Sequence, residues 1–540
     1  MGRRRDAVSG VILLLSVTVF GPQEPRASAT TPGDVAEPVR PSVQLEPVDR
    51  STGRRVTLAS GGDLQRALNE AVPGDVIVLE AGAVFRGRFI LPKKRGAGWV
   101  TISAAGMEDG PSRPGRRITP SDAHRMPKIV STGPEPAIAT DPGAHRYRFV
   151  GVEFTLDPAV TTNYGIIVLG SRAQRLGEIP QHLVFERCYI HGREHQNVHR
   201  GIELNSASTA IVDSHISDIH YAGVETQAIA GWNGPGPFLI QNNYIEGASI
   251  NVLFGGADPS IPQLVPSDIE LRGNHFHKPL SWRRNGANAS GRRWAIKNLF
   301  EIKAARRVLV EGNVFEHSWA DAQEGWAVRF VLGTDRDAAI SDITFDSNII
   351  KGAAHGLDIC GRCAGTSATP VSRVAIRNNV FTDIGGAAWT TAKPSGWALM
   401  LRNGVRDISV ERNTFVQRGS LLVMDGTAGE RLVFARNIAA HNEYGVFGSP
   451  FVGKAALERY FRRYVFTNNV LFAVPSGVPT AQYPAGNMFA KTIYDVGFMD
   501  AEGGNFRLGP KSPYSSIAER GGLGVDFDRL ATALPPGVRP

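Results

Sequence analysis

Acidic and basic side chains stand close together in short alternating segments of this chain, where they could act on an anionic substrate. Glu301 and Lys303 lie two residues apart in LFEIKAA, and Arg329 lies in the similar segment WAVRFVL. Alternate residues of a β-strand point to the same face, so Glu301 and Lys303 should share one. A lysine can remove a proton and an arginine can hold a carboxylate, which are two requirements of β-elimination from a uronate. We therefore predict Lys303 and Arg329 as catalytic residues.

Similar segments also carry the oxygen ligands that hard cations prefer. GIELNSA, GVETQAI, INVLFGG and LFEIKAA align on four residues taken as inward-facing, Ile202, Val224, Ile250 and Phe300. The position after each of these then forms an outward row of four predicted metal ligands, Glu203, Glu225, Asn251 and Glu301, and Arg329 and Asp358 continue the row in WAVRFVL and HGLDICG. Carboxylate and amide oxygens suit Ca²⁺, which is the expected cofactor. A row of charges that only stabilises stacked strands remains an open alternative.

Three segments that we interpret as loops mix aromatic and polar side chains. KPLSWRRNGANASGRRWAIKN interleaves arginines with tryptophans, and GWNGPGP and GGADPSIP should open on the same edge of a groove. Indole rings stack on sugars and guanidinium groups bind acids. The predicted substrate contacts are Trp232, Asn233, Asp258, Trp282, Arg283, Arg284, Arg292, Arg293, Trp294 and Lys297. Such a mixture could also bind single-stranded nucleic acid, which we do not expect in an exported chain, or could simply form an exposed insertion anchored by its tryptophans.

Histidines and cysteines give weaker signals. IHGREHQNVHRG holds three histidines in what should be a loop, so we expect no metal there, and we predict His220 as a further general acid or base. Cys360 and Cys363 form CGRC, which could have a local redox or metal role. Cys188 falls at a strand turn, and three cysteines cannot form a disulfide framework.

A repeated phrase supplies the frame for these residues: apolar, x, apolar, x, x, Asn, x, Phe or Ile. Its turn positions are Val152, Cys188, Ser214, Asn243, Asn274, Asn313, Asn348, Asn379, Asn413, Asn437 and Asn469. Alternation before the asparagine predicts a strand, and asparagine tolerates the left-handed backbone that a tight bend needs. The asparagines of successive coils should therefore stack in ladders.

The unequal spacing of this phrase selects the fold. Each coil of a β-solenoid returns to the same position while its loops vary in length. Leucine-rich repeats would need a tighter period, and propeller blades would need four strands per unit, so both fit less well. We predict an all-β, right-handed parallel β-helix of about ten to twelve coils, spanning residues 146–475.

The regions outside the solenoid have their own signals. Arg3 to Arg5, an apolar stretch at 8–20 and Ala27-Ser28-Ala29 predict a signal peptide at 1–29, because the stretch is too short for a membrane anchor. Residues 30–55 are rich in proline and should be a disordered leader. Residues 56–145 should hold a capping helix within GGDLQRALNEAVPGD and the first coils, and 476–540 a C-terminal cover.

Composition and charge point the same way. Sixty glycines and 34 prolines favour turns over long helices, and the formal charge of +8 favours an anionic partner, although a merely soluble surface explains it equally well. We expect a secreted monomer without a membrane span after signal removal, acting on an acidic polysaccharide and not on nucleic acid.

The chain resembles bacterial right-handed parallel β-helix repeat proteins of the pectate-lyase-like superfamily. The phrases DLQRALNEAVPGDVIVLEAGAVFRG, QAIAGWNGPGPFLIQNNYIE and NFRLGPKSPY carry this resemblance, which covers nearly all of the chain after residue 29. It implies polysaccharide lyase or hydrolase chemistry as a class. Two Glu, one Asn and a following Lys and Arg are similar to the calcium-assisted lyases of alginate and dermatan sulfate, although Lys303 lies about one residue out of register with Asn313 and the surrounding lyase signature is missing.

Two functions follow as expectations. The first is a lyase that cleaves uronate-containing polysaccharide by β-elimination. A glycoside hydrolase is disfavoured, because the chain lacks the vicinal Asp pairs of β-helix hydrolases. The second is a non-catalytic β-helix that binds glycan or serves as a cell-surface structural element.

Overall fold

The computed structural model describes residues 35–46, 48, 53–107, 116–283, 293–333, 338–363, 369–393 and 395–539. The predicted signal peptide at 1–29, Arg284 and Arg292 lie outside the described residues. No helix in the described part is long and apolar enough to cross a membrane.

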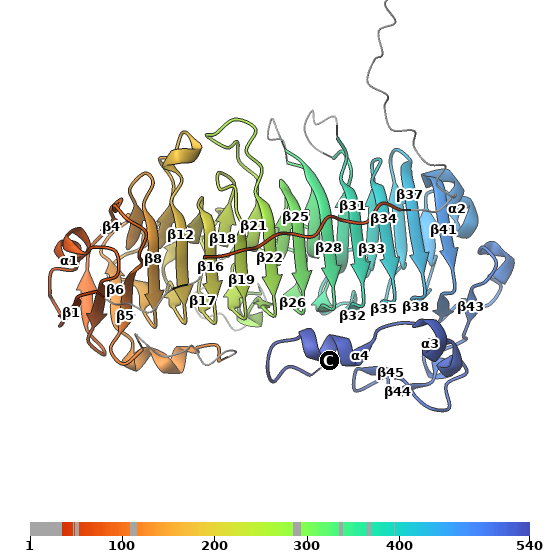
Figure 1. The fold of residues 1–540 in the computed structure, drawn as a ribbon. Coiled ribbons are helices and arrows are strands. Elements are labelled where there is room, and N and C mark those ends of the chain that lie inside the picture. The colour runs from red at the N-terminus through yellow and green to blue at the C-terminus, as the bar shows by residue number, and fades with distance from the viewer. Residues whose placement is uncertain are drawn as a thin grey trace, which may run out of the picture.

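Three long sheets coil around one axis (Figure 1). Sheet A has 14 strands, from β1 (Arg55–Leu58) to β41 (Phe461–Thr467), and sheet B has 14, from β3 (Val84–Arg86) to β43 (Met488–Phe489). Sheet C has 13, from β4 (Phe89–Leu91) to β40 (Phe451–Val452). Each coil places one strand in each sheet, and neighbours pair in parallel except at β39–β40, where β39 is Val446–Gly448. The predicted right-handed parallel β-helix is confirmed.

The interior is a continuous stack of apolar side chains. Inward residues of successive coils lie at matching positions, so aromatic rings meet their counterparts one coil on. Phe276 and Phe315 stack with ring centroids 4.5 Å apart, and Phe381 and Phe415, also partners in register, lie 4.6 Å apart. Each coil thus buries its apolar face only against its neighbours, which is the general source of stability in solenoids.

The asparagine ladder forms, but the asparagines have a different structural role from the one predicted. From Asn243 onward, each side-chain Oδ1 accepts the backbone N–H of the ladder residue one coil earlier at 2.8–3.1 Å. The ladder continues one coil beyond Asn469, to Asn487. The left-handed residue is the one before the asparagine, for example Asn242 at φ 51° and Asn378 at φ 56°. The asparagine therefore serves as a hydrogen-bonding side chain and not as the bend itself.

Two helices close the ends of the stack. Helix α1 (Leu64–Glu70) buries Leu64, Ala67 and Leu68, as predicted for the N-terminal cap. Helix α2 (Gly453–Tyr460), which the sequence did not predict, buries Ala456 and Leu457 in the main core near the last coils.

The C-terminal segment covers a side of the β-helix. Helices α3 (Ser515–Gly521) and α4 (Phe527–Ala533) lie along the lower edge of the molecule in Figure 1. Phe527 and Leu530 of α4 pack on Val314, Ile349 and Val380, which point outward from sheet B. The later strands of that sheet are therefore shielded by this segment.

The expected disordered leader is wrong for its described part, 35–46. This segment crosses the strands of sheet A (Figure 1), and the backbone N–H groups of Ala36, Val39 and Ser42 donate to aspartates at 3.2, 3.1 and 3.0 Å. Those aspartates are Asp407, Asp342 and Asp268, which lie two coils apart. Three extended residues span about 10 Å, as do two coils at about 4.8 Å each, so the spacing matches. Proline content suggested disorder, whereas it equally suits an extended strap.

Candidate functional site

The predicted outward row lies on sheet C but with a different membership. Seven strands carry it: β15 (Arg200–Leu204), β18 (Gln227–Gly231), β21 (Ile250–Phe254), β24 (Phe300–Ile302), β27 (Trp326–Val331), β30 (His355–Cys360) and β33 (Leu399–Arg402). The row runs Glu203, Ala230, Leu253, Glu301, Arg329, Asp358 and Met400. The alignment of Glu301, Arg329 and Asp358 is thus confirmed, and that of Glu225 and Asn251 is wrong.

Glu225 lies before its strand and not on it. Ile229, and not Val224, pairs with Ile202, so the segment is shifted by five residues from the predicted alignment. The carboxylate of Glu225 forms an ion pair with Lys297 and accepts from Gln227 Nε2 at 3.0 Å. Burial alone would raise the pKa of Glu225, but the hydrogen bond and charge of Lys297, with the charge of Lys303, hold it below its ordinary value. Glu225 is therefore a partner of the two lysines.

Asn251 points into the interior. Val252, and not Ile250, continues the inward row, so Asn251 falls at the corner of the coil. Its Nδ2 donates to the carbonyls of Ile245 and His277 at 2.6 and 2.9 Å, and its Oδ1 accepts from Lys278 Nζ at 2.9 Å. Burial lowers the pKa of the fully enclosed Lys278 well below its ordinary value. Asn251 is therefore structural.

The four predicted calcium ligands do not come together. Glu203 and Glu301 occupy the same row three strands apart, about 14 Å at the usual strand spacing. Glu203 faces Arg200 at 3.5 Å, and Glu301 accepts from Asn298 Nδ2 at 3.1 Å. Within the described ranges, no group of three or more His, Cys, Asp or Glu side chains could hold a metal ion. The described residues therefore do not fit the expected calcium centre.

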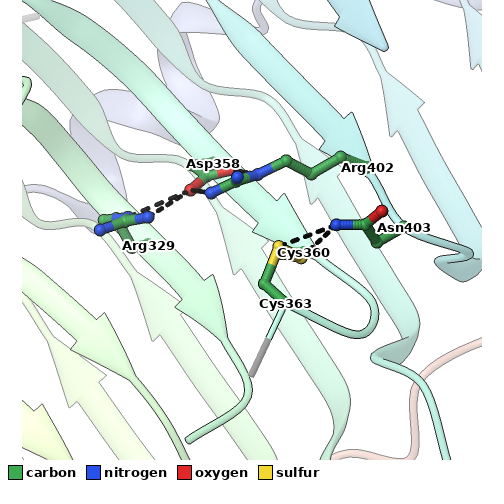
Figure 2. Close-up of a disulfide and its surroundings, with 6 residues drawn as sticks. All are labelled: Arg329, Asp358, Cys360, Cys363, Arg402 and Asn403. Carbon is green, nitrogen blue, oxygen red and sulfur yellow. Dashed lines mark hydrogen bonds and ion pairs between the residues drawn. A yellow bond between two sulfur atoms is a disulfide. The ribbon is translucent and has the colours of Figure 1, made fainter. Parts of the chain in front are cut away.

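A fully buried carboxylate joins two arginines at the other end of the row. Figure 2 shows Asp358 between Arg329 and Arg402, on neighbouring coils. Arg329 donates to Asp358 Oδ2 from Nε at 3.1 Å and from Nη2 at 2.9 Å. Arg402 donates to Oδ1 and Oδ2 at 2.9 and 2.7 Å. Two guanidinium groups and one carboxylate leave a net positive charge, fixed in place and partly exposed.

Two amide side chains extend this network toward Glu301. Asn298 Nδ2 donates to Gln323 Oε1 at 3.2 Å, and Arg329 Nη1 donates to the same oxygen at 3.3 Å. Asn298 also holds Glu301, so one chain of contacts links Glu301 to Arg329. Asn298, Gln323 and Arg402 were not predicted from the sequence, although Arg402 ends a short alternating segment like the others.

Lys303 belongs to the same face. It follows β24 directly, two residues beyond Glu301, and its charge acts on Glu225 across the coils. Glu301 pairs in register with Arg329 on the next strand, whereas the side chain of Lys303 lies against Gly256, which follows the preceding strand β21. The predicted base and the predicted carboxylate clamp therefore lie on opposite sides of Glu301 along the sheet.

The predicted contacts in the shorter loops have varied roles. Trp232 lies under the guanidinium of Arg200, 4.9 Å from it, and Asp258 is exposed. Asn233 is buried: its Nδ2 donates to Ala173 O at 3.1 Å and its Oδ1 accepts from Ile261 N at 3.1 Å. The two loops thus lie together as expected, and Asn233 ties them.

In the longer insertion, Arg293 is exposed, whereas the guanidinium of Arg283 lies over Trp319 and Trp389 at 5.8 and 5.6 Å. Trp282 and Trp294 are buried against His220, with ring centroids at 5.5 and 3.9 Å. The fully buried His220 ring cannot reach a substrate, so its predicted catalytic role is wrong.

The CGRC pair forms a local disulfide between Cys360 and Cys363, next to the arginine pair (Figure 2). Asn403 Nδ2 lies 3.1 Å from the sulfur of Cys363 and 3.6 Å from that of Cys360. Both cysteines of the motif are thus bonded to each other, and Cys188 is a buried free thiol.

No protein-family model and no curated protein sequence matches the chain. Among solved structures, a mutant of the PL6 family alginate lyase AlyGC matches 89% of this chain at 13% identity and a TM-score of 0.49, and this chain spans only 57% of that protein. A mannuronic-acid-specific family 6 lyase from human gut microbiota matches 90% of this chain, over 96% of its own length, at 12% identity and a TM-score of 0.45.

A GH87 α-1,3-glucanase from Streptomyces thermodiastaticus matches 83% of this chain and 70% of its own at 12% identity and a TM-score of 0.43. Such distant likenesses carry no conclusion about activity. The three coiled parallel sheets make the chain a right-handed parallel β-helix protein.

Proposed function

We propose that the protein is secreted, binds an acidic, uronate-containing polysaccharide along the outward face of sheet C, and cleaves it by β-elimination. The observation that carries this proposal is the row of sheet C in which Arg329 is held by the buried Asp358 and pairs in register with Glu301, two residues before Lys303. The second guanidinium, that of Arg402, adds the charge that an anionic chain requires.

The chemistry follows from these positions. A uronate carboxylate bound near Arg329 and Arg402 loses part of its negative charge, which acidifies the hydrogen on the adjacent ring carbon. Lys303 acts as the base that takes that proton, the C–H electrons form a carbon–carbon double bond, and the glycosidic C–O bond breaks. The leaving oxygen then receives a proton, which the protonated Lys303 can return. The products are an unsaturated uronate end and a new hydroxyl end.

One observation favours the non-catalytic alternative. The charges on this face already pair with one another, Lys297 with Glu225 and Arg329 with Asp358. A surface of paired charges can bind a glycan without transforming it, with Arg200 over Trp232 as a half-buried stacking platform. The two functions differ in whether Lys303 is needed for product formation.

Incubation with pectate, alginate and glycosaminoglycans distinguishes the lyase from the non-catalytic binding protein. Ultraviolet absorbance follows unsaturated ends, and affinity electrophoresis follows binding. We expect an absorbance rise on at least one polyuronate that Lys303→Ala abolishes while binding persists. Binding without any absorbance rise would establish the non-catalytic alternative, and neither binding nor product would reject both.

A further inference from the structure

A cleft of about 530 Å³ opens on sheet B, away from the charged face of sheet C. Its base comes from β13 (Tyr189–His191), β17 (His215–Ser217) and β20 (Tyr244–Glu246). The apolar contacts of the C-terminal segment begin further along the sheet, at β26 (Val314–Ser318). The C-terminal segment thus covers the later strands of sheet B, and the segment 116–126 packs on Tyr189 at one side of the cleft.

The base of the cleft is an aromatic ladder. Tyr189, His215 and Tyr244 occupy the same register on successive strands. His215 stacks on Tyr244 at 4.4 Å between ring centroids and meets Tyr189 edge-on at 5.3 Å. Burial lowers the pKa of His215 to about 4, so its ring is neutral near pH 7. Tyr189 and His215 are buried, so the half-buried Tyr244 is the ladder ring that can pack against the apolar face of a sugar ring.

Two carboxylates stand beside this ladder in fixed positions. Tyr244 donates its hydroxyl proton to Glu246 Oε1 at 2.6 Å, and the hydroxyl oxygen lies 2.8 Å from His277 Nδ1. Glu246 Oε2 also accepts the backbone N–H of Asp218 at 3.4 Å. Ser217 Oγ donates to Asp218 Oδ2 at 3.4 Å. A carboxylate has about four acceptor positions, so both retain capacity for donors from a ligand.

The charge of the lining decides which ligand fits. Among the described residues that line the cleft, Glu194, Asp218 and Glu246 are acidic, and none is a lysine or arginine. Burial, reinforced by the charge of Glu246, raises the pKa of Asp218 to about 6, so it is mostly ionised at pH 7. A polyuronate would be repelled here, whereas hydroxyl or ammonium groups would find acceptors. Trp282 adds a further aromatic wall.

We infer that this cleft is a second saccharide-binding site, which takes a pyranose ring bearing hydroxyl or ammonium donors and no acidic group. The aromatic ladder binds the apolar face of the ring, and Asp218 and Glu246 accept its donors. This inference does not depend on the lyase proposal, because no residue of the charged face lines the cleft.

Isothermal titration with three probes tests the site: cello-oligosaccharides, chitosan oligosaccharides and oligogalacturonate. The wild type is compared with the double variant Asp218→Asn/Glu246→Gln and with Glu316→Gln, a matched control from the outward row of Glu246 two coils on and outside the cleft. We expect the neutral or the amino sugar to bind, with affinity reduced about tenfold in the double variant and unchanged in the control, an effect of about 1.4 kcal/mol.

Cello-oligosaccharides and chitosan oligosaccharides distinguish the two kinds of donor. Stronger binding of chitosan oligosaccharides would show recognition of ammonium groups, and equal binding of both would show recognition of hydroxyl groups. Tyr244→Phe keeps the ring and removes the hydroxyl that holds Glu246, and it gives a second reading if the double variant fails to fold. Lys303→Ala should leave cleft binding unchanged. Absence of binding by both favourable probes, or wild-type affinity in the double variant and in Tyr244→Phe, would overturn the inference. Oligogalacturonate binding that the double variant abolishes would do the same.

Discussion

Arg329 and Asp358 occupy the same register on adjacent coils of sheet C, and the guanidinium gives two hydrogen bonds to one oxygen of a fully buried carboxylate. Arg402 approaches the same carboxylate from the next coil (Figure 2). Asp358 therefore determines where the positive charge of the proposed site lies.

Replacing Asp358 should cost both stability and function. Asp358→Asn removes the charge that two arginines share, and breaking a buried ion pair commonly costs about 3–5 kcal/mol. We expect a fall of that order in the free energy of unfolding, measured by denaturant titration. Asp425→Asn is the control, because Asp425 pairs in register with Arg402 but is exposed. Equal effects of the two changes would argue against the shared carboxylate.

Arg329→Lys should preserve the positive charge but strongly reduce the rate of cleavage. An ammonium group cannot reproduce the planar guanidinium that bonds Asp358 and Gln323 while facing substrate. We expect a rate reduction of about 100-fold or more in the absorbance assay, the range typical of a lost electrostatic contact. Arg306→Lys, on sheet A, should leave the rate unchanged. Full activity in Arg329→Lys would remove Arg329 from the mechanism.

A chelator should not abolish cleavage. The predicted ligands Glu203 and Glu301 lie three strands apart, and Asn251 is directed inward to Lys278. Charge neutralisation is therefore assigned to Arg329 and Arg402. We expect equal initial rates before and after treatment with EDTA and dialysis. If EDTA abolished activity and added Ca²⁺ restored it, this assignment would be contradicted and Ca²⁺ would be the cofactor, as the sequence predicted.

His355 should make folding sensitive to acid. Burial lowers its pKa to about 4, partly offset by the charge of Asp358, and its Nδ1 accepts the backbone N–H of Trp397 at 3.4 Å. Between about pH 6.5 and pH 4 the unfolded chain binds a proton that the folded chain does not, so stability falls as the pH drops through this window.

His355→Gln should therefore flatten the plot of unfolding free energy against pH in that window, by up to about 3 kcal/mol over its width. Denaturant titrations at several pH values from 4 to 7.5 measure this. His124→Gln, at an exposed histidine, is the control. An unchanged slope in His355→Gln would mean that other groups, such as the similarly shifted His199 and His215, account for the dependence.

The N-terminal strap should detach when one of its donors is removed. Val39→Pro deletes the N–H that donates to Asp342, in a segment whose backbone donates at every third residue and whose Glu37 and Glu46 pair with Arg377 and Arg146. We expect faster proteolytic cleavage within residues 35–46 while the β-helix itself stays resistant. Arg40→Pro, at the adjacent residue, is the control, and equal cleavage of both variants would show that the Asp342 contact does not hold the strap.

Much of the fold could be predicted from the sequence because the patterns that specify it lie within a few residues of one another. The alternation before each asparagine and the recurrence of Asn313, Asn348 and Asn379 depend on period-two geometry and on one hydrogen-bonding side chain, so the coil order and the alignment of Glu301, Arg329 and Asp358 followed directly. The prediction of Lys303 and Arg329 on one face rests on the same regularity.

The site residues whose predicted positions were wrong lie next to bends of the chain. Glu225 and Asn251 were assigned to the row by continuing the alternation across corners, where a single added residue reverses the face to which a side chain points. The aromatic ladder of Tyr189, His215 and Tyr244 had a sequence signal, the position after each turn, but nothing in one coil shows which neighbours will be covered.

The amino-acid sequence alone thus determined the coiled architecture, because strand alternation and the asparagine ladder arise within a few residues and repeat. Only the tertiary structure decided which charges pair, which face stays open and where the strap and C-terminal segment lie. Those outcomes depend on loop lengths and on contacts between residues hundreds of positions apart, such as Val39 with Asp342.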